Sequence, residues 1–273
     1  MNKAETQNIE TAFKIPDSIR RLIEGKPYTT DEIGMSGSKI MIFDDSVLKI
    51  VNYRKENDDT IQMMKWLEGK LPAPKVLCYE KDSDHQYLLM SKVQGKMSCD
   101  GYYLEYPQEL LTRLAEALKM LWSVDISGCP RNRDIDAKLR EAKYRVENHL
   151  VDLDNVAPTT FGDGGFPDPQ ALLVWLEKNR PDYEPVLSHG DFCLPNIFIE
   201  NRKISGFIDL GDTGIGDKWR DLALCYRSLR QNFDGSFGGK IYPDFNPDML
   251  FDVLGIEPNR EKLQYYILLD ELF

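Results

Sequence analysis

Apolar and polar positions follow two different periods along the chain, and the change comes near residue 100. In the first part, the short apolar runs SKIMIF (38–43) and SVLKIV (46–51) flank Asp44 and Asp45. Strand-length apolar runs around a pair of turn-forming residues predict a tight hairpin. The run QYLLMSKV (86–93) has the length of a further strand.

A helical period interrupts these strands once. The segment DDTIQMMKWLEGK (58–70) repeats apolar residues at roughly helical spacing and ends at Gly69, a residue that favours a helix C-terminus. The resulting order is strand, strand, helix, strand, strand. We therefore expect a small antiparallel sheet that carries one helix.

From Pro107 onward most of the pattern is helical. A second hairpin is expected where NIFIE and KISGFIDL flank Asn201 and Arg202, and the Gly- and Pro-rich stretch 155–169 is expected to be a long loop. The fold class is therefore α+β, with lobes predicted at 1–93 and 94–273 and a ligand crevice between them. The expected helices are 107–125, 136–153, 168–179, 217–231 and 259–273.

Composition narrows the classes of function. The chain has 273 residues, 42% apolar and 29% charged, which is typical of a globular protein. The net charge of −11 argues against a nucleic-acid partner, since phosphate binding needs a basic surface. No apolar run is long enough for a membrane span and no secretory signal is seen, so we expect a cytoplasmic protein. The five cysteines are scattered and predict neither a zinc site nor a disulfide framework.

The informative spacing is H-G-D-x-x-x-x-N in residues 189–196. Asp191 and Asn196 precede the strand at 197–199, and Asp209 ends the next strand, so a paired hairpin brings all three to one edge. Phosphoryl transfer needs such a set: one carboxylate to accept the proton of the attacking hydroxyl, and oxygen ligands to hold Mg²⁺. Either aspartate alone is more simply a turn residue beside glycine. Together, at this spacing, they favour phosphoryl transfer.

The chain resembles the aminoglycoside 3′-phosphotransferases, bacterial resistance kinases with a protein-kinase-like, two-lobed fold. The resemblance covers nearly the whole chain from about residue 30. The HGDxxxxN motif alone also fits choline, homoserine and macrolide kinases. The C-terminal LLDELF is the segment that narrows the resemblance to the aminoglycoside 3′-phosphotransferases. The segments that carry it are SHGDFCLPNIFI (188–199), SGFIDLGDTGIGDKW (205–219), YYILLDELF (265–273), WLEGKLPAPKVL (66–77) and LLMS (88–91).

The resemblance implies a role for each matching residue. Asp191 is implied to be the catalytic aspartate, and Asn196 and Asp209 the Mg²⁺ ligands. Lys49 is implied to bind the α- and β-phosphates of ATP, for which GTP is an alternative donor. A lysine inside an apolar strand is costly unless its charge is met, although an outward-facing edge lysine is the alternative. The remaining nucleotide contacts are implied at Met35 and Ser36 of the phosphate loop and at the backbone of Ser91 and Val93.

The substrate is expected at the C-terminus of the chain. Asp270, Glu271 and the carboxylate of Phe273 cluster at the end of one helix, where negative charge opposes the helix dipole and favours a bound cation. The resemblance places the polyamine antibiotic there, with Asp191 at its reacting hydroxyl. A frayed, solvated helix end is the alternative.

Some positions differ from the family pattern. Thr60 stands where kinases carry the glutamate that pairs with the strand lysine, with Asp59 and Glu56 close by. Gln231 and Asn232 are neutral where acids are expected, Asp212 stands where close relatives often carry arginine, and Asp163 is the acid that remains in the substrate loop.

The expected activity is transfer of the γ-phosphate of ATP to the 3′-hydroxyl of an aminoglycoside, by a monomer or weak homodimer. The alternatives are a kinase for another hydroxyl-bearing cation, choline-like or macrolide-type, or a weakly active nucleotide-binding homologue.

Overall fold

The small sheet is antiparallel throughout. The structure, a computed structural model, describes residues 14–31, 38–237 and 239–273, without the side chains of Asp31, Lys55 and Glu56. The strands lie in the order β1-β2-β3-β5-β4. Their bounds are β1 (Thr29–Asp31), β2 (Lys39–Ile42), β3 (Ser46–Asn52), β4 (Val76–Lys81) and β5 (His85–Ser91).

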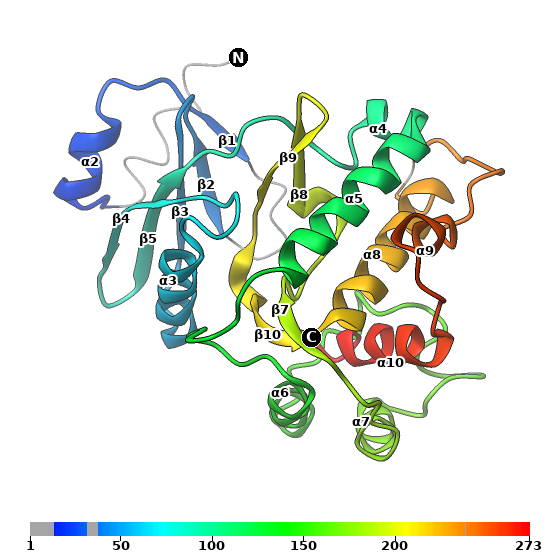
Figure 1. Ribbon diagram of the computed structural model, residues 1–273. Coiled ribbons are helices and arrows are strands. Elements are labelled where there is room, and N and C mark those ends of the chain that lie inside the picture. Colours follow the sequence, from blue (N-terminus) through cyan, green and yellow to red (C-terminus); the bar gives the residue numbers. More distant parts are fainter. Residues whose placement is uncertain (1–13, 32–37, 238) are drawn as a thin grey trace.

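The alternation along β3 explains the two faces of this sheet. Leu48 and Ile50 are buried in a cluster with Ile19 and Ile23 of helix α2 (Asp17–Ile23), whereas Lys49 points to the other face. Helix α3 (Lys55–Leu67) lies beside the sheet (Figure 1) and packs its apolar residues into the larger core of the molecule. β3 lies between β2 and β5, so the alternative of an edge lysine is wrong.

The remaining helices gather in the other part of the molecule (Figure 1). Pro107 begins the central helix α5, and the leucines at helical spacing along it are buried. Helix α8 begins where the Asp217 carboxylate accepts a hydrogen bond from Trp219 N–H. The helices are α4 (Gly101–Glu105), α5 (Pro107–Trp122), α6 (Ile135–Glu147), α7 (Pro169–Lys178), α8 (Lys218–Phe233), α9 (Met249–Leu254) and α10 (Arg260–Asp270).

Two further sheets, smaller than the five-stranded one, bring distant segments together. β6 (Lys96–Met97), β8 (Ile197–Glu200) and β9 (Lys203–Phe207) form one, and the β8–β9 turn is made by Asn201 and Arg202 with φ of 49° and 60°. β7 (Pro185–Ser188) pairs with β10 (Gly214–Asp217) in the other. Pairing of Ser188 with Gly214 places the segment after β7 beside the turn before β10.

The predicted elements and the observed ones agree for long segments and differ for short ones. The α+β class, both hairpins and the five long helices are confirmed, but the predicted end of the helix from 136 is wrong: it stops at Glu147 instead of 153. The last helix stops at Asp270 instead of continuing to residue 273. The missed helices and strands, α2, α4, α9, β1, β6, β7 and β10, are mostly too short to show a period. The boundary between residues 93 and 94 stays a prediction.

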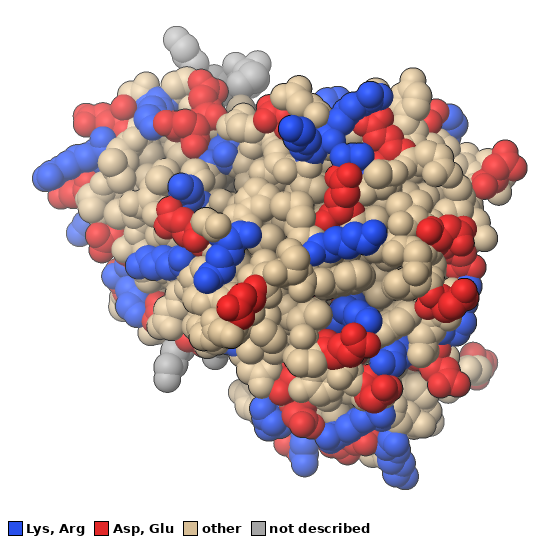
Figure 2. Space-filling view, in the orientation of Figure 1, with Lys and Arg blue, Asp and Glu red and all other residues tan. Residues whose placement is uncertain are grey.

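Charged residues of both signs are interspersed on the face shown in Figure 2, so the surplus of acidic residues does not form a single patch there. Within the described ranges, no helix is both long and apolar enough to cross a membrane.

The segment after β5 packs closely on the β8–β9 hairpin. A Cβ at Gly206 meets Val93 Cγ1 at 2.4 Å, and one at Gly95 meets the Ile199 carbonyl oxygen at 2.5 Å. Ser205 Oγ donates to the Gln94 carbonyl at 2.6 Å. The path of residues 93–95 is therefore fixed by contact with the hairpin.

Gly206→Ala tests this contact. We expect it to lower the free energy of unfolding by about 1–3 kcal/mol, because the added methyl group overlaps the Val93 side chain. Urea denaturation measures the change. Gly101→Ala is the matched control, since no atom lies within 4 Å of a Cβ at that position. Equal stability of both variants and the wild type contradicts the proposed tight contact.

Candidate active site

A buried carboxylate holds the loop that carries Asp191. Asp221, on α8, is fully buried and accepts hydrogen bonds from Ser188 Oγ at 3.0 Å, His189 N–H at 2.9 Å and Gly190 N–H at 2.9 Å. Burial raises the pKa of the Asp221 carboxyl, while the His189 ring and these backbone donors act against that shift. The loop is thus tied to the core helix just before Asp191.

Asn196 lies against Asp191 within the same loop. Its Nδ2 donates to the Asp191 Oδ2 at 2.8 Å and to the Asp191 carbonyl at 3.0 Å. The short 3-10 helix η1 (Leu194–Asn196) provides this approach, and Ser228 Oγ accepts from Leu194 N–H at 3.0 Å. With both amide hydrogens directed at Asp191, the Asn196 Oδ1 is turned to a different side, where it is suited to bind a cation.

The third predicted residue lies on the neighbouring turn. Ile208 N–H donates to the Asn196 carbonyl at 2.9 Å, so the residue that follows, Asp209, lies next to the loop. Asp209 adopts the left-handed conformation with φ of 58° and ψ of 55°, which is uncommon for a residue other than glycine. Strained backbone of this kind is frequent at functional sites.

Lys49 reaches the same place from the small sheet. Its Nζ lies 3.5 Å from Asp209 Oδ1, and its side chain is 30% exposed. The described ion pairs do not join Lys49 to α3: Asp59 is exposed to solvent, and the Glu56 side chain lies outside the described residues. The structure therefore brings Lys49, Asp191, Asn196 and Asp209 together from three segments of the chain.

These residues fit a magnesium ion. Mg²⁺ prefers oxygen ligands and uses few protein side chains. Asn196 offers its amide oxygen, since its amide nitrogen already donates to Asp191. Asp209 offers a carboxylate on a side chain that is 56% exposed. Two oxygen donors that lie on adjacent segments match this preference. The assignment of both residues as ligands stays a prediction.

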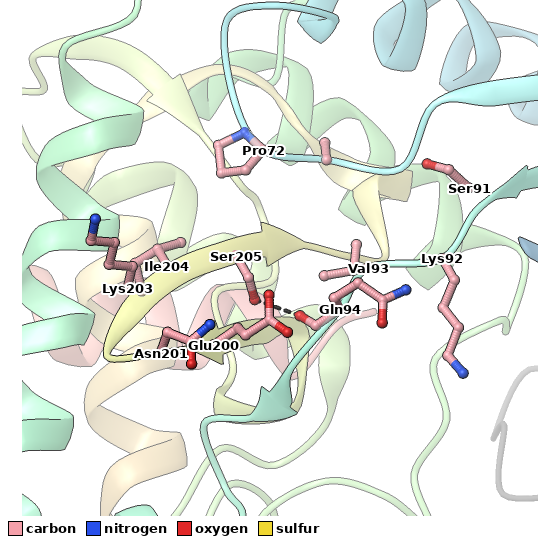
Figure 3. A pocket seen from close by; sticks show the side chains of 11 residues that line it. Pro72, Ser91, Lys92, Val93, Gln94, Glu200, Asn201, Lys203, Ile204 and Ser205 are labelled. Atoms are coloured by element: carbon pink, nitrogen blue, oxygen red, sulfur yellow. Dashed lines mark hydrogen bonds between the residues drawn. The ribbon is translucent and has the colours of Figure 1, made fainter. Parts of the chain in front are cut away.

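The segment predicted to bind adenine borders a cavity of about 680 Å³ (Figure 3). The cavity lies between residues 91–94, which follow β5, and the β8–β9 hairpin. Ser91 and Val93 both line it. Ser91 N–H is already bonded to the Lys75 carbonyl at 2.9 Å, whereas Val93 N–H has no partner within the described part of the chain. Val93 N–H is therefore available to a ligand. Met35 and Ser36, the other predicted nucleotide contacts, lie outside the described residues.

The predicted substrate acids are already paired inside the protein. Asp270 Oδ2 lies 2.5 Å from Arg227 Nη2, and Glu271 Oε2 accepts from Ala157 N–H at 2.7 Å. Arg145 Nη2 donates to the Phe273 backbone oxygen at 2.6 Å. The helix end is therefore ordered by cations and amides of the chain, and the alternative of a frayed end does not describe it.

Asp212 belongs to a separate buried cluster. Its carboxylate contacts Arg220, lies 2.8 Å from Arg133 Nε and accepts from Lys138 Nζ at 3.1 Å. Burial alone raises the pKa of the Asp212 carboxyl, but the three cations, Arg220 above all, outweigh this effect and hold it well below its ordinary value. Lys138 also lies 3.3 Å from the centre of the Phe273 ring.

The other positions that differ from the family pattern contribute less. Asn232 donates to the Ser228 carbonyl of its own helix at 2.8 Å, Gln231 is half-buried, and Asp163 is exposed. Sequence reasoning missed Asp221 and Lys138. The available signal was a charged residue among apolar ones on one helix face, Lys138 with Ile135 and Ala142, and Asp221 beside Leu222, because such residues are rarely buried without partners.

Comparison with known proteins gives a consistent result. The family model described as phosphotransferase enzyme family matches residues 43–243. An aminoglycoside 3′-phosphotransferase of Enterococcus faecalis is 39% identical, with 96% of this chain and 99% of the relative covered. One from Staphylococcus aureus is 38% identical with the same coverage.

Solved structures agree on the fold. An aminoglycoside phosphotransferase from Streptomyces rimosus superposes with a TM-score of 0.78 at 22% identity, covering 93% of this chain and 95% of that one. The crystal structure of an aminoglycoside-3′-phosphotransferase of type VIII gives 0.77 at 24% identity, covering 94% and 97%. The predicted two-lobed, kinase-like fold is confirmed.

The buried lysine gives a pH-dependent prediction. Burial lowers the pKa of Lys138 to about 8 from its ordinary 10.5, with the charge of Arg220 acting in the same direction. Between these pH values the unfolded chain holds a proton that the folded protein has released, so stability rises with pH. This group is expected to add about 3 kcal/mol to the free energy of unfolding across that window.

Urea denaturation of the wild type and of Lys138→Met, near pH 7 and near pH 10.5, tests this prediction. The measured quantity is the free energy of unfolding of the wild type minus that of the variant at each pH. The wild type is expected to gain about 3 kcal/mol relative to the variant over that range. Lys143→Met, which removes an exposed lysine from the same helix, is the control and is expected to show no such change. Identical pH profiles for the two variants contradict the assignment.

Proposed function

Because the chain belongs to the aminoglycoside 3′-phosphotransferase family, we propose that it transfers the γ-phosphate of ATP to the 3′-hydroxyl of an aminoglycoside and so confers resistance. The observation that carries the proposal is the convergence of Asp191, Asn196, Asp209 and Lys49 at one place, with Lys49 Nζ 3.5 Å from Asp209 Oδ1. Such a set provides the charges and the proton acceptor that phosphoryl transfer needs.

Asp191 is proposed to bind the attacking hydroxyl. The hydrogen bond from Asn196 Nδ2 to Asp191 Oδ2, at 2.8 Å, fixes the carboxylate in one orientation and leaves Oδ1 for the substrate. Positioning of the hydroxyl in line with the phosphorus atom, together with acceptance of its proton, is the main contribution that a protein makes to this reaction.

The nucleotide is proposed to lie between Lys49 and the segment that contains Val93. Lys49 neutralises phosphate charge, and the Val93 N–H is a donor for the adenine ring. Asn196 Oδ1 and the Asp209 carboxylate are proposed to hold Mg²⁺, which neutralises charge on the phosphates when bound. In support, the structure of the Streptomyces rimosus enzyme with ADP and streptomycin superposes on this chain with a TM-score of 0.77.

The aminoglycoside is proposed to bind along Asp270, Glu271 and Phe273. Asp270 is 25% exposed at the side chain, so an ammonium group of the substrate has access to it. Glu271 is only 5% exposed and its carboxylate accepts from Ala157 N–H, so it also fixes the long loop that follows α6. Asp270 is therefore the acid most open to direct contact with the substrate.

The primary test is turnover of purified protein with ATP and Mg²⁺. Kanamycin and neomycin are expected to be phosphorylated, and choline, homoserine and a macrolide are not. No turnover of any aminoglycoside refutes the proposal, and turnover of one of the other alcohols supports the corresponding kinase instead.

Asp191→Asn tests the assigned role of the catalytic residue. The amide keeps the size of the carboxylate but accepts no proton, so we expect kcat to fall by about 100-fold or more. The dissociation constant for ADP, measured by calorimetry, is expected to stay within about threefold of the wild type, because nucleotide binding uses other groups. Asp252→Asn, at an exposed position on α9, is the control. Undiminished kcat in Asp191→Asn removes this residue from the mechanism.

Asp270→Asn tests the substrate end. Loss of a charge-assisted contact worth about 1.5–3 kcal/mol is expected to raise the KM for kanamycin about tenfold or more. The KM for ATP is expected to change little. Asp252→Asn, at an exposed position on α9, serves as the matched control. If the kanamycin KM of Asp270→Asn equals that of this control, Asp270 does not contact the substrate.

A further inference from the structure

Arg131 is a buried cation whose partners are mainly carbonyl oxygens of the turn that carries Asp209. Its Nη2 donates to the Leu210 carbonyl at 2.8 Å, Nη1 to the Gly211 carbonyl at 2.9 Å, and Nε to the Thr213 carbonyl at 2.6 Å. The residue is 8% exposed. One guanidinium group thus binds three carbonyls within four residues of the turn, a planar fork that only arginine provides.

The main chain of this segment is fixed as well. The Arg131 carbonyl accepts from Ile215 N–H at 2.9 Å, and Arg133 N–H donates to the Ile215 carbonyl at 2.7 Å. Asn132 forms an isolated parallel bridge with Ile215. The guanidinium therefore extends from a backbone that is itself bonded to β10, and its position relative to the turn is well defined.

The charge of Arg131 is not matched by a close carboxylate. None of the described ion pairs includes it, and burial, together with the nearby charge of Arg133, lowers the pKa of Arg131 to about 10. A buried cation costs free energy unless its hydrogens are bonded. The carbonyl oxygens satisfy it, which indicates that the arginine serves the geometry of the turn rather than an ion pair.

That geometry is the one that directs Asp209. The left-handed backbone of Asp209 is unfavourable for an aspartate and persists only where its surroundings hold it. Arg131 binds the carbonyls of the two residues that follow, Leu210 and Gly211, so it fixes the chain at the exit of this strained residue. In this arrangement the Asp209 carboxylate lies 3.5 Å from Lys49 Nζ.

The same guanidinium also contacts α3, the helix beside the five-stranded sheet. Arg131 Nη1 donates to Thr60 Oγ1 on α3 at 3.3 Å. Thr60 occupies the position at which an acidic partner of the strand lysine was expected. Helix α3 is therefore joined to the turn through a hydroxyl and an arginine of the helical part of the chain.

We propose that Arg131 is a positioning residue for the phosphoryl-transfer site: it holds the turn so that Asp209 binds the metal–nucleotide complex, and it couples α3 to that turn through Thr60. The proposal rests on the proposed function, because it concerns the same site. Its main consequence is for Mg²⁺-dependent nucleotide binding, which is measured without any aminoglycoside.

The test is calorimetric titration of ADP into the full-length protein at a series of Mg²⁺ concentrations. In Arg131→Met, the Mg²⁺ concentration that gives the half-maximal gain in ADP affinity is expected to rise about tenfold or more, because Asp209 is no longer held. With kanamycin, kcat is expected to fall by about 100-fold while the kanamycin KM stays within about threefold. Arg131→Lys is expected to show nearly the same Mg²⁺ dependence and kcat as Arg131→Met, since an ammonium group does not span three carbonyls.

Thr60→Val separates the link to α3 from the support of the turn. It keeps the shape of the side chain and removes one acceptor, and we expect a Mg²⁺ shift of about two- to fivefold. Arg113→Met is the matched control: Arg113 is a partly buried arginine on α5 that donates to the Arg202 carbonyl at 2.8 Å, at the end of the β8–β9 hairpin opposite to Asp209. It is expected to leave the Mg²⁺ dependence unchanged.

Two results overturn the proposal. One is a folded Arg131→Met protein whose Mg²⁺ dependence matches that of Arg113→Met, which assigns Arg131 a merely structural role. The other, which decides the matter if Arg131→Met does not fold, is a Thr60→Val protein with wild-type Mg²⁺ dependence. If the Mg²⁺ shifts occur but the wild type phosphorylates no aminoglycoside, the proposed function fails while the role of Arg131 stands.

Discussion

The buried carboxylate of Asp221 is the constraint on which the rest of the site depends. It is fully buried on the core helix α8 and accepts from the hydroxyl of Ser188 and the N–H groups of His189 and Gly190. A buried carboxylate without these donors is strongly unfavourable, so the loop has one acceptable position relative to the core. Gly190 adds a steric condition: its φ is 85°, and a Cβ there lies 2.3 Å from the Asp212 carbonyl oxygen. The loop that carries Asp191 and the turn that carries Asp209 therefore pack together directly.

The five-stranded sheet and α3 are joined to that part of the molecule by polar groups at the site as well as by the apolar residues that α3 packs into the larger core. The turn after Asp209 is bound by Arg131, which also bonds to Thr60 of α3, and Asp209 itself meets Lys49 of β3. Each link is a hydrogen bond or ion pair of moderate strength. Such links define the geometry of the site, while the apolar contacts of α3 hold the two parts of the molecule together.

Short-range patterns predicted most of the fold and the central residues of the site. The spacing of Asp191 and Asn196, and the hairpin that leads to Asp209, lie within about twenty residues, so local pairing rules were sufficient. The contacts that were missed join distant positions: 31 residues separate Gly190 from Asp221, 71 separate Thr60 from Arg131, and 128 separate Arg145 from Phe273. The periodicity of apolar and polar residues along the sequence does not indicate such pairs. The short strands β7 and β10 were missed because four residues carry too little pattern.

The substrate end differs physically from the catalytic centre. Asp270 is already paired with Arg227, and Glu271 already accepts from Ala157 N–H. In the proposed site, a substrate ammonium group therefore binds the exposed part of the Asp270 carboxylate beside an existing partner, Arg227. At the catalytic centre, by contrast, the donors are backbone N–H groups and buried side chains that have no alternative partner. In the proposed site, substitutions among the cations near Asp270 are therefore expected to change which aminoglycosides bind, whereas the transfer chemistry is expected to tolerate little change in the contacts of Asp221 and Asn196.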